Sequence, residues 1–213
     1  LDAPVPAARP RLLVIDRPNS PQSVLLAARV LPIKGTQQGF ESLELANEVI
    51  GDGFLSRLNM DLREEKGWTY GIRSGLTGGV GPRAFTVFTP VQSDRTGDSI
   101  TAILGNLAAF PATKGVDATE LQCVTEGNVR GLPNRFETNA QVLGDQLLGR
   151  PNDYQRKLPD IYRAIDAAKI DAAARQYLGS EGLVIVVVGD RKQIDSQIEA
   201  LGMPVEYLEA AKL

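Results

Sequence analysis

The residues best suited to chemistry lie between Leu55 and Gly71, in the stretch LSRLNMDLREEKGWTYG. Arg63 carries a guanidinium with several N–H donors, and Tyr70 carries a phenol that can donate one hydrogen bond. At one edge of a sheet, such a pair could grip a peptide carbonyl or carboxylate. The same two residues are also typical of a solvated charge on a helix and a half-buried aromatic on a strand. Residue type alone leaves both interpretations open.

Two predicted elements position this arginine and this tyrosine. An amphipathic helix is indicated by three leucines that fall on one helical face: Leu55, Leu58 and Leu62. On the same helix, Arg57 and Asp61 are four residues apart and are expected to pair across one turn. Gly67 is expected to end the helix, because glycine readily takes positive φ, and the β-forming residues at 68–70 begin a strand. The turn between these elements would bring the arginine and the tyrosine side by side.

Composition limits the classes of function. The chain has 213 residues, of which 43% are hydrophobic and 23% are charged, as in a globular protein of one large domain or two small ones. Its net charge of −3 argues against nucleic acid as a partner. No apolar run approaches the ~18 residues of a membrane-spanning helix, so no membrane span is predicted.

Histidine is absent from the whole chain, and Cys123 is the single cysteine. Catalytic zinc sites commonly use two or three histidines, so we predict no metal site and no cofactor in this chain. A Ser-His-Asp or Cys-His arrangement is excluded for the same reason. Carboxylates alone can hold Mg²⁺ or Ca²⁺, but no acidic D-x-D-x-D-G loop occurs. Cys123 cannot form an internal disulfide and is expected to be a small buried residue on a helix.

The order of predicted elements favours one domain at 11–213, preceded by a Pro- and Ala-rich linker at 1–10. Strands are predicted at 11–16, 22–31, 68–76, 83–91 and 183–188. The first two strands are expected to form an antiparallel hairpin. Helices are predicted at 39–50, 55–66, 95–110, 117–131, 135–148, 154–165, 170–178 and 192–201. Leu132-Pro133 is expected to interrupt the helical block. The tail MPVEYLEA shows only a marginal pattern, and no helix or strand is assigned to it.

Strands that come in pairs, followed by a block of helices, indicate an α+β fold with an antiparallel β-sheet and helices packed mainly on one face. A nucleotide-binding fold is not supported, because βαβ alternation and G-x-G-x-x-G are both missing around the strand LVIVVV. The Gly-rich run at 77–82 lacks the Lys-Ser/Thr of a phosphate-binding loop and is predicted to be a hairpin turn.

The whole string SRLNMDLREEKGWTYG resembles the run S-R-L…L-R-x-x-x-G-x-x-Y-G in the C-terminal, non-catalytic half of pitrilysin/insulinase-family zinc metallopeptidases. The resemblance implies that Arg63 and Tyr70 reach across a cavity into the active site of the other half. There, Arg63 would anchor the substrate backbone and Tyr70 would donate a hydrogen bond to the developing oxyanion. The string IDRPNSPQS is also similar to the family, and implies that Gln22 and Ser23 bind substrate at the start of an edge strand; an ordinary hairpin remains the alternative.

The resemblance also implies where the missing chemistry lies. In the catalytic half, the helix equivalent to 39–50 carries the zinc-binding His-x-x-Glu-His motif, whereas here it offers Glu41, Glu44 and Glu48, which we expect to form a solvated face. Zinc and the general base would therefore come from a partner half, fused upstream or on a separate chain, and the substrate would be a peptide in an enclosed chamber. This chain alone is expected to be inactive, and a homo-oligomer is compatible with the resemblance.

Two other functions remain open at this stage. Some relatives of this family are structural subunits of the respiratory-complex core type, and a module that only captures peptides is a third possibility. The intact pair of Arg63 and Tyr70 favours the peptidase, because a scaffold has no need of it. The sequence begins with Leu1 and shows no signal peptide, as expected for a processed or truncated product. The bacterial periplasm is favoured over the cytoplasm, because bacterial two-half members of this family can be periplasmic.

Overall fold

The computed structural model of the protein describes residues 9–135 and 139–209. The predicted linker at 1–10 therefore lies almost wholly outside the described residues. No helix within the described part of the chain is long and apolar enough to cross a membrane.

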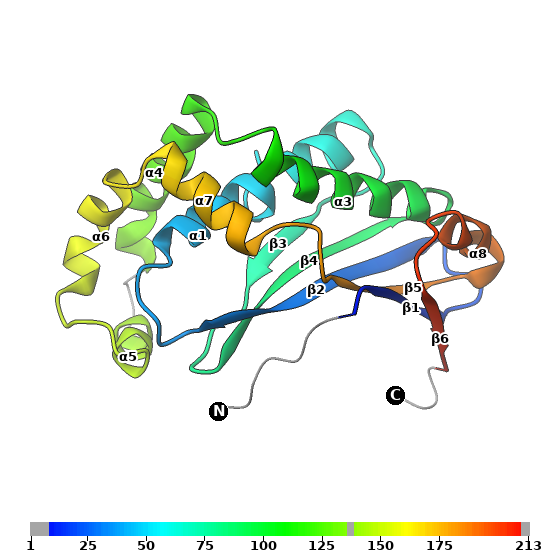
Figure 1. Cartoon of the computed structure of the whole chain (residues 1–213), viewed down its shortest axis with the longest axis horizontal. Coiled ribbons are helices and arrows are strands. Elements are labelled where there is room, and N and C mark those ends of the chain that lie inside the picture. Colours follow the sequence, from blue (N-terminus) through cyan, green and yellow to red (C-terminus); the bar gives the residue numbers. More distant parts are fainter. Residues whose placement is uncertain (1–8, 136–138, 210–213) are drawn as a thin grey trace.

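The described strands form one six-stranded sheet in the order β3-β4-β2-β5-β1-β6 (Figure 1). Their bounds are β1 (Arg11–Asp16), β2 (Gln22–Lys34), β3 (Arg73–Leu76), β4 (Pro82–Gln92), β5 (Val184–Gly189) and β6 (Val205–Leu208). The strands β3, β4, β2 and β5 pair antiparallel, whereas β1 pairs parallel with both β5 and β6. The α+β class is confirmed, and the sheet is mixed rather than wholly antiparallel.

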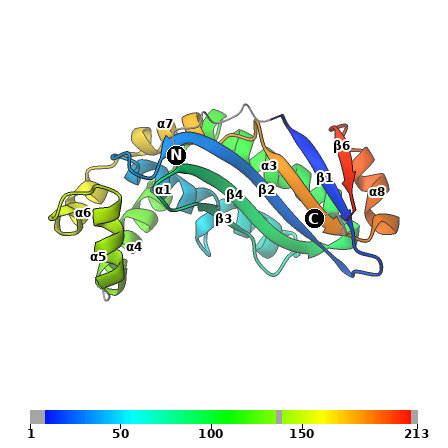
Figure 2. The ribbon, with the colours of Figure 1, turned by 90° about the horizontal axis from the view of Figure 1, so that it is seen from below.

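The helices cover mainly one face of this sheet, as predicted, and Figure 2 shows the opposite face of the long, curved strands β2 and β4 left open. The helical segments are α1 (Glu41–Asn47), η1 (Glu48–Asp52), α2 (Arg57–Asn59), η2 (Met60–Glu65), η3 (Ser93–Arg95), α3 (Thr96–Ala112), α4 (Ala118–Arg135), α5 (Asn139–Leu147), α6 (Tyr154–Arg163), α7 (Ala167–Tyr177) and α8 (Arg191–Glu199). Of these, η1 and η2 are wide π-helical turns that continue α1 and α2. The predicted break at Pro133 is wrong, because α4 continues to Arg135.

The predicted hairpin of β1 and β2 is also wrong, because β5 lies between the two strands. The run LVIVVV is apolar on both faces, and such a strand is stable in the interior of a sheet, where it has a neighbour on each side. As a result, β2 is an interior strand between β4 and β5, not the edge strand that the family resemblance implied. The edges of the sheet are β3 and β6, and β6 lies in the tail that the sequence pattern left unassigned.

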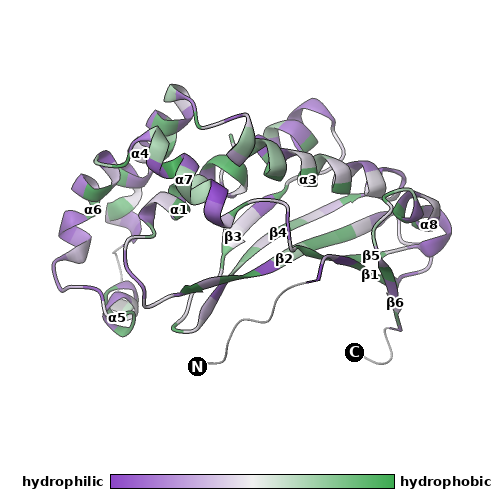
Figure 3. Cartoon of the chain, viewed as in Figure 1, coloured by the Kyte–Doolittle hydropathy of each residue, from purple (hydrophilic) through white to green (hydrophobic). Residues whose placement is uncertain are grey.

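The core lies between the sheet and the helices. Alternate residues of each strand point toward the helical layer, and Figure 3 shows hydrophobic residues concentrated along β5 and β1. Burying these side chains, each worth about 1.5–3 kcal/mol, drives the two layers together. Fully buried members of this core include Leu12, Leu25, Phe85, Leu107, Val187 and Ile194.

Candidate functional site

Arg63 is placed by the π-helical turn η2, which ends at Glu65 and is followed by Gly67. Gly67 has φ of +65°, so it ends the helical segment as predicted, and its N–H donates to the Arg63 carbonyl at 3.1 Å. The Arg63 guanidinium lies over the ring of Phe54, 4.7 Å from its centroid, and its Nε is 3.4 Å from Glu64 Oε1. This stacking holds the guanidinium while leaving N–H donors open to a ligand.

Tyr70 is placed by a segment that is not a strand. The predicted strand at 68–76 begins only at Arg73, and Trp68 to Ile72 runs as coil beside β4. Pro90 of β4 has no N–H for a regular ladder at this point. Hydroxyls replace the ladder, because Thr69 Oγ1 donates to Pro90 O at 2.6 Å and Thr89 Oγ1 donates to Gly71 O at 3.1 Å. The segment is thereby fixed to the sheet without regular pairing.

Thr69 and Tyr70 point in opposite directions from this segment. Thr69 is buried at 8% exposure, whereas Tyr70 is 88% exposed. No described residue hydrogen-bonds the Tyr70 hydroxyl, which is therefore available to a ligand. A large aromatic held outward on a fixed segment is unusual for a residue that serves only packing.

Arg63 and Tyr70 line the same small pocket, which has a volume of about 210 Å³, so the turn at Gly67 does bring the pair together. Asn59 also lines the pocket, and its Nδ2 donates to the Phe54 carbonyl at 2.7 Å, which fixes the preceding loop. Arg73, the first residue of the edge strand β3, adds a second guanidinium. Asp52 also lines the pocket, and its carboxylate attracts the Arg73 guanidinium. The Arg63 guanidinium and the Tyr70 phenol remain as donors suited to a carbonyl or carboxylate oxygen.

Gln22 and Ser23 are placed differently. Gln22 is exposed at the start of β2, opposite Gln92 of β4. Ser23 is fully buried, and its Oγ accepts a hydrogen bond from Thr96 Oγ1 at 2.8 Å. Neither residue lines the pocket of Arg63 and Tyr70. A role for these two residues in binding substrate stays a prediction, and the burial of Ser23 leaves only Gln22 with an accessible side chain.

The three glutamates of the first helical segment do not form the solvated face that was predicted. Glu41 is buried and accepts a hydrogen bond from the Tyr154 hydroxyl at 2.8 Å. Glu44 lies 3.8 Å from Arg83 and 3.9 Å from Arg150, and burial raises its pKa. The helices α4 and α6 cover this surface, which explains the correction. Among the described residues, no three carboxylates, thiols or imidazoles lie close enough to hold a metal ion.

Glu48 accepts a hydrogen bond from a residue far along the chain. Its Oε2 accepts from Asn128 Nδ2 at 2.7 Å, and burial raises its pKa to about 7. Glu48 lines a second pocket of about 440 Å³, formed by η1, the loop after it and α4. Phe54 and Leu55 line this pocket too and are 63% and 66% exposed. The sequence pattern assigned Leu55 to a buried face, so this pocket was missed.

Cys123 lies on the rim of the same pocket and is exposed, so the expectation that it is buried was wrong. It belongs to the part of α4 that faces solvent, while Leu132 is buried and Leu121, Val124 and Val129 pack against the core. The orientation of a helical residue is predicted from the spacing of apolar residues around it. A single small residue such as this cysteine fits either face, so its orientation could not be predicted.

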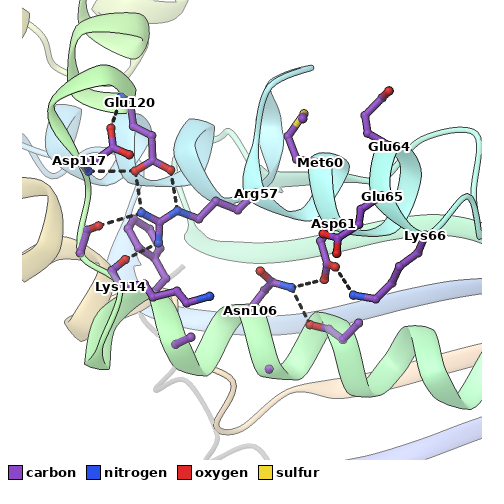
Figure 4. A pocket seen from close by; sticks show the side chains of 15 residues that line it. Arg57, Met60, Asp61, Glu64, Glu65, Lys66, Asn106, Lys114, Asp117 and Glu120 are labelled. Carbon is purple, nitrogen blue, oxygen red and sulfur yellow. Dashed lines mark hydrogen bonds and ion pairs between the residues drawn. The ribbon is translucent and has the colours of Figure 1, made fainter.

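A third, larger groove of about 1010 Å³ runs between η2 and α3 (Figure 4). Here Arg57 does not pair with Asp61 as predicted: its Nε and Nη2 bind the two oxygens of Glu120 at 2.7 and 2.6 Å. Asp61 instead pairs with Lys66 and accepts from Asn106 Nδ2 at 2.6 Å. The charges lining this groove are thus largely engaged in holding the helices together.

Known structures share this fold. The peptidase M16 inactive domain of Pseudomonas fluorescens is 22% identical, with a TM-score of 0.77 over 88% of this chain and 45% of its own. A protease from Helicobacter pylori is 12% identical, with a TM-score of 0.69 over 86% of this chain and 45% of its own. The inactive peptidase domain of a proposed zinc protease from Bordetella parapertussis is 17% identical, with a TM-score of 0.63 over 80% of this chain and 92% of its own.

The chain therefore spans less than half the length of the first two proteins and nearly all of the third. No curated protein matches it significantly. The family model of the peptidase M16 inactive domain matches residues 2–124, which is more than half of the chain. The match includes the whole stretch from Leu55 to Gly71. The resemblance found in the sequence is thus confirmed: the chain belongs to the inactive-domain family of the M16 zinc peptidases.

Proposed function

We propose that this chain is the substrate-holding, non-catalytic half of a zinc metallopeptidase, and that Arg63 and Tyr70 complete an active site on a partner half. The single observation that carries the proposal is the pocket that these two residues line together, with an exposed phenol that no described residue engages. The chain contains no histidine, and its described carboxylates form no metal-binding group, so zinc does not fit here and would be held by the partner half.

The geometry supports distinct roles for the two side chains. The Arg63 guanidinium is held by Phe54 in a fixed orientation, which suits it to grip a backbone carbonyl or carboxylate in both the bound and the reacting state. The exposed hydroxyl of Tyr70 is free to donate to an oxygen that gains negative charge during reaction. A peptide would lie along the open edge of β3, which among the described strands pairs with β4 alone and ends the sheet on this side.

The test is reconstitution of this chain with a catalytic half that carries His-x-x-Glu-His. We expect peptidase activity that neither chain shows alone. Tyr70→Phe should lower kcat on the order of 10²-fold, as for other single oxyanion donors, with little change in stability. Arg63→Ala should mainly raise KM.

Tyr207→Phe makes the same chemical change at the opposite edge of the sheet and should leave both constants unchanged. A complex that assembles without any peptidase activity would favour the scaffold function instead. A Tyr70→Phe variant that turns over at the unmodified rate would remove this tyrosine from the proposed site.

A further inference from the structure

We propose that the second pocket, lined by Glu48, Phe54, Leu55 and Cys123, binds a lysine or arginine side chain of the peptide, with Glu48 accepting its cation. This inference rests on the proposed function, because it concerns the same peptide. It adds a substrate class, peptides with a basic side chain next to the residue held by Arg63 and Tyr70.

The walls of the pocket suit a long aliphatic stem. Its volume is about 440 Å³, enough for one extended side chain, and its lining is mostly apolar. Phe54 and Leu55 form one wall, and Val124 with the bare backbone of Gly127 forms another. Lysine and arginine side chains bury their methylene stems against apolar walls while their charged ends reach polar groups. A wholly apolar pocket would suit an aliphatic side chain. The Glu48 carboxylate in this pocket favours a side chain that ends in a cation.

Glu48 forms no ion pair with any described residue, and Arg135 attracts it only from beyond ion-pair distance. Its Oε2 accepts from Asn128, whose amide nitrogen also donates to the Val124 carbonyl at 2.8 Å, while Oε1 has no hydrogen-bond partner among the described residues. The other carboxylate of the pocket, Glu120, is already bound by Arg57. The ammonium or guanidinium of a bound peptide would donate to Glu48 Oε1. Such charge-assisted hydrogen bonds are among the stronger ones.

Burial is the main cause that raises the pKa of Glu48 to about 7, and the hydrogen bond from Asn128 acts against it. Repulsion from Asp52 of η1 and Glu44 of α1 raises the pKa further, and Arg135 of α4 lowers it. A bound cation favours the ionised carboxylate. Binding of a basic side chain should therefore strengthen as pH rises through 7 and weaken as the carboxyl becomes protonated below that value.

The two pockets are adjacent. Gly53 and Phe54 line both of them, and the guanidinium of Arg63 stacks on the Phe54 ring. A peptide whose backbone oxygen lies at Arg63 and Tyr70 would thus place a neighbouring side chain close to the Glu48 pocket. This adjacency argues for the substrate as the occupant, rather than for an unrelated partner.

The experiment compares two fluorescent alanine-based peptides, identical except for lysine or norleucine at the centre, by anisotropy with the full chain. Norleucine keeps the aliphatic stem and lacks the charge. At pH 8 we expect the lysine peptide to bind on the order of tenfold more tightly. The preference should disappear at pH 5.5, and in Glu48→Gln, which keeps an acceptor for Asn128. Glu126→Gln removes a half-exposed charge from α4, the helix that carries Asn128, and should leave the preference intact.

The single cysteine gives an independent measure of occupancy. Because Cys123 lies on the rim of the pocket, the lysine peptide should slow its alkylation, and the norleucine peptide should slow it less. Equal binding of the two peptides, with affinity still lost in Arg63→Ala, would overturn this inference and leave the proposed function standing. If Arg63→Ala binds both peptides as tightly as the unmodified chain does, that result would count against the proposed function. Protection of Cys123 by the catalytic half alone would make the pocket a domain interface, and absence of any peptide binding would overturn both proposals.

Discussion

Arg57 connects the stretch from Leu55 to Gly71, which carries Arg63 and Tyr70, to the other helices. Its removal should lower the free energy of unfolding. Its guanidinium donates to both oxygens of Glu120, and its Nη2 also donates to the Gly115 carbonyl at 2.8 Å. It also lies 4.6 Å from the centroid of the Phe110 ring. One side chain thus ties α2 to the end of α3, to the following loop and to the first turn of α4 (Figure 4).

The magnitude follows from these partners and from their exposure. A hydrogen bond to a charged group contributes about 1.5–3 kcal/mol when buried. The side chains of Arg57 and Glu120 remain 18% and 25% exposed, so water can partly replace the lost bonds after Arg57→Ala. We therefore expect a loss of about 2–4 kcal/mol in the free energy of unfolding. For a domain of this size, that loss corresponds to a fall of roughly 5–15 °C in Tm.

The assay is urea unfolding monitored by circular dichroism, with Arg130→Ala as the matched control. Arg130 lies on α4, its side chain is 80% exposed, and its ion pair with Glu126 spans 3.5 Å. Such a pair contributes at most about 0.5 kcal/mol. Arg57→Lys keeps the charge but lacks the planar fork, so it should fall between the wild-type chain and the alanine variant. If Arg57→Ala unfolds within about 0.5 kcal/mol of Arg130→Ala, the reasoning from partners and burial is refuted.

Three further substitutions test the packing and a buried hydrogen bond of the fold. Gly51→Ala should destabilise the chain by about 1–3 kcal/mol, because its Cβ would lie 2.5 Å from Ser74 Oγ and 2.9 Å from the Ser74 backbone nitrogen. Gly105→Ala, with nothing within 4 Å, should instead stabilise α3 by up to about 1 kcal/mol, and equal effects in chemical denaturation would contradict the argument. Tyr154→Phe should cost about 1–3 kcal/mol, since it removes the donor to the buried Glu41 carboxylate; an unchanged denaturation midpoint would show that water satisfies this carboxylate.

The sequence by itself determined the features that depend on neighbours along the chain. Gly67 ends its helical segment because glycine takes positive φ without strain, and this is visible from residue type and position. The turn then brings Arg63 and Tyr70 to one pocket, as predicted, because only seven residues separate them. The absence of histidine excludes the usual zinc site from this chain on residue types alone, whatever the fold places together.

Tertiary structure decided what depends on partners distant in sequence. The pairing of β1 with β5 joins residues about 170 positions apart, and no local pattern tells a strand which neighbour it will take. The same holds for Glu48, which resembles a solvated residue until Asn128 of α4 lies against it and burial raises the pKa of its carboxyl. Tyr70 faces solvent because its neighbour Thr69 is buried and donates to the Pro90 carbonyl, so the two side chains lie on opposite sides of the segment. Burial and charge are properties of the packed layers, so they become defined only when helices and sheet have come together.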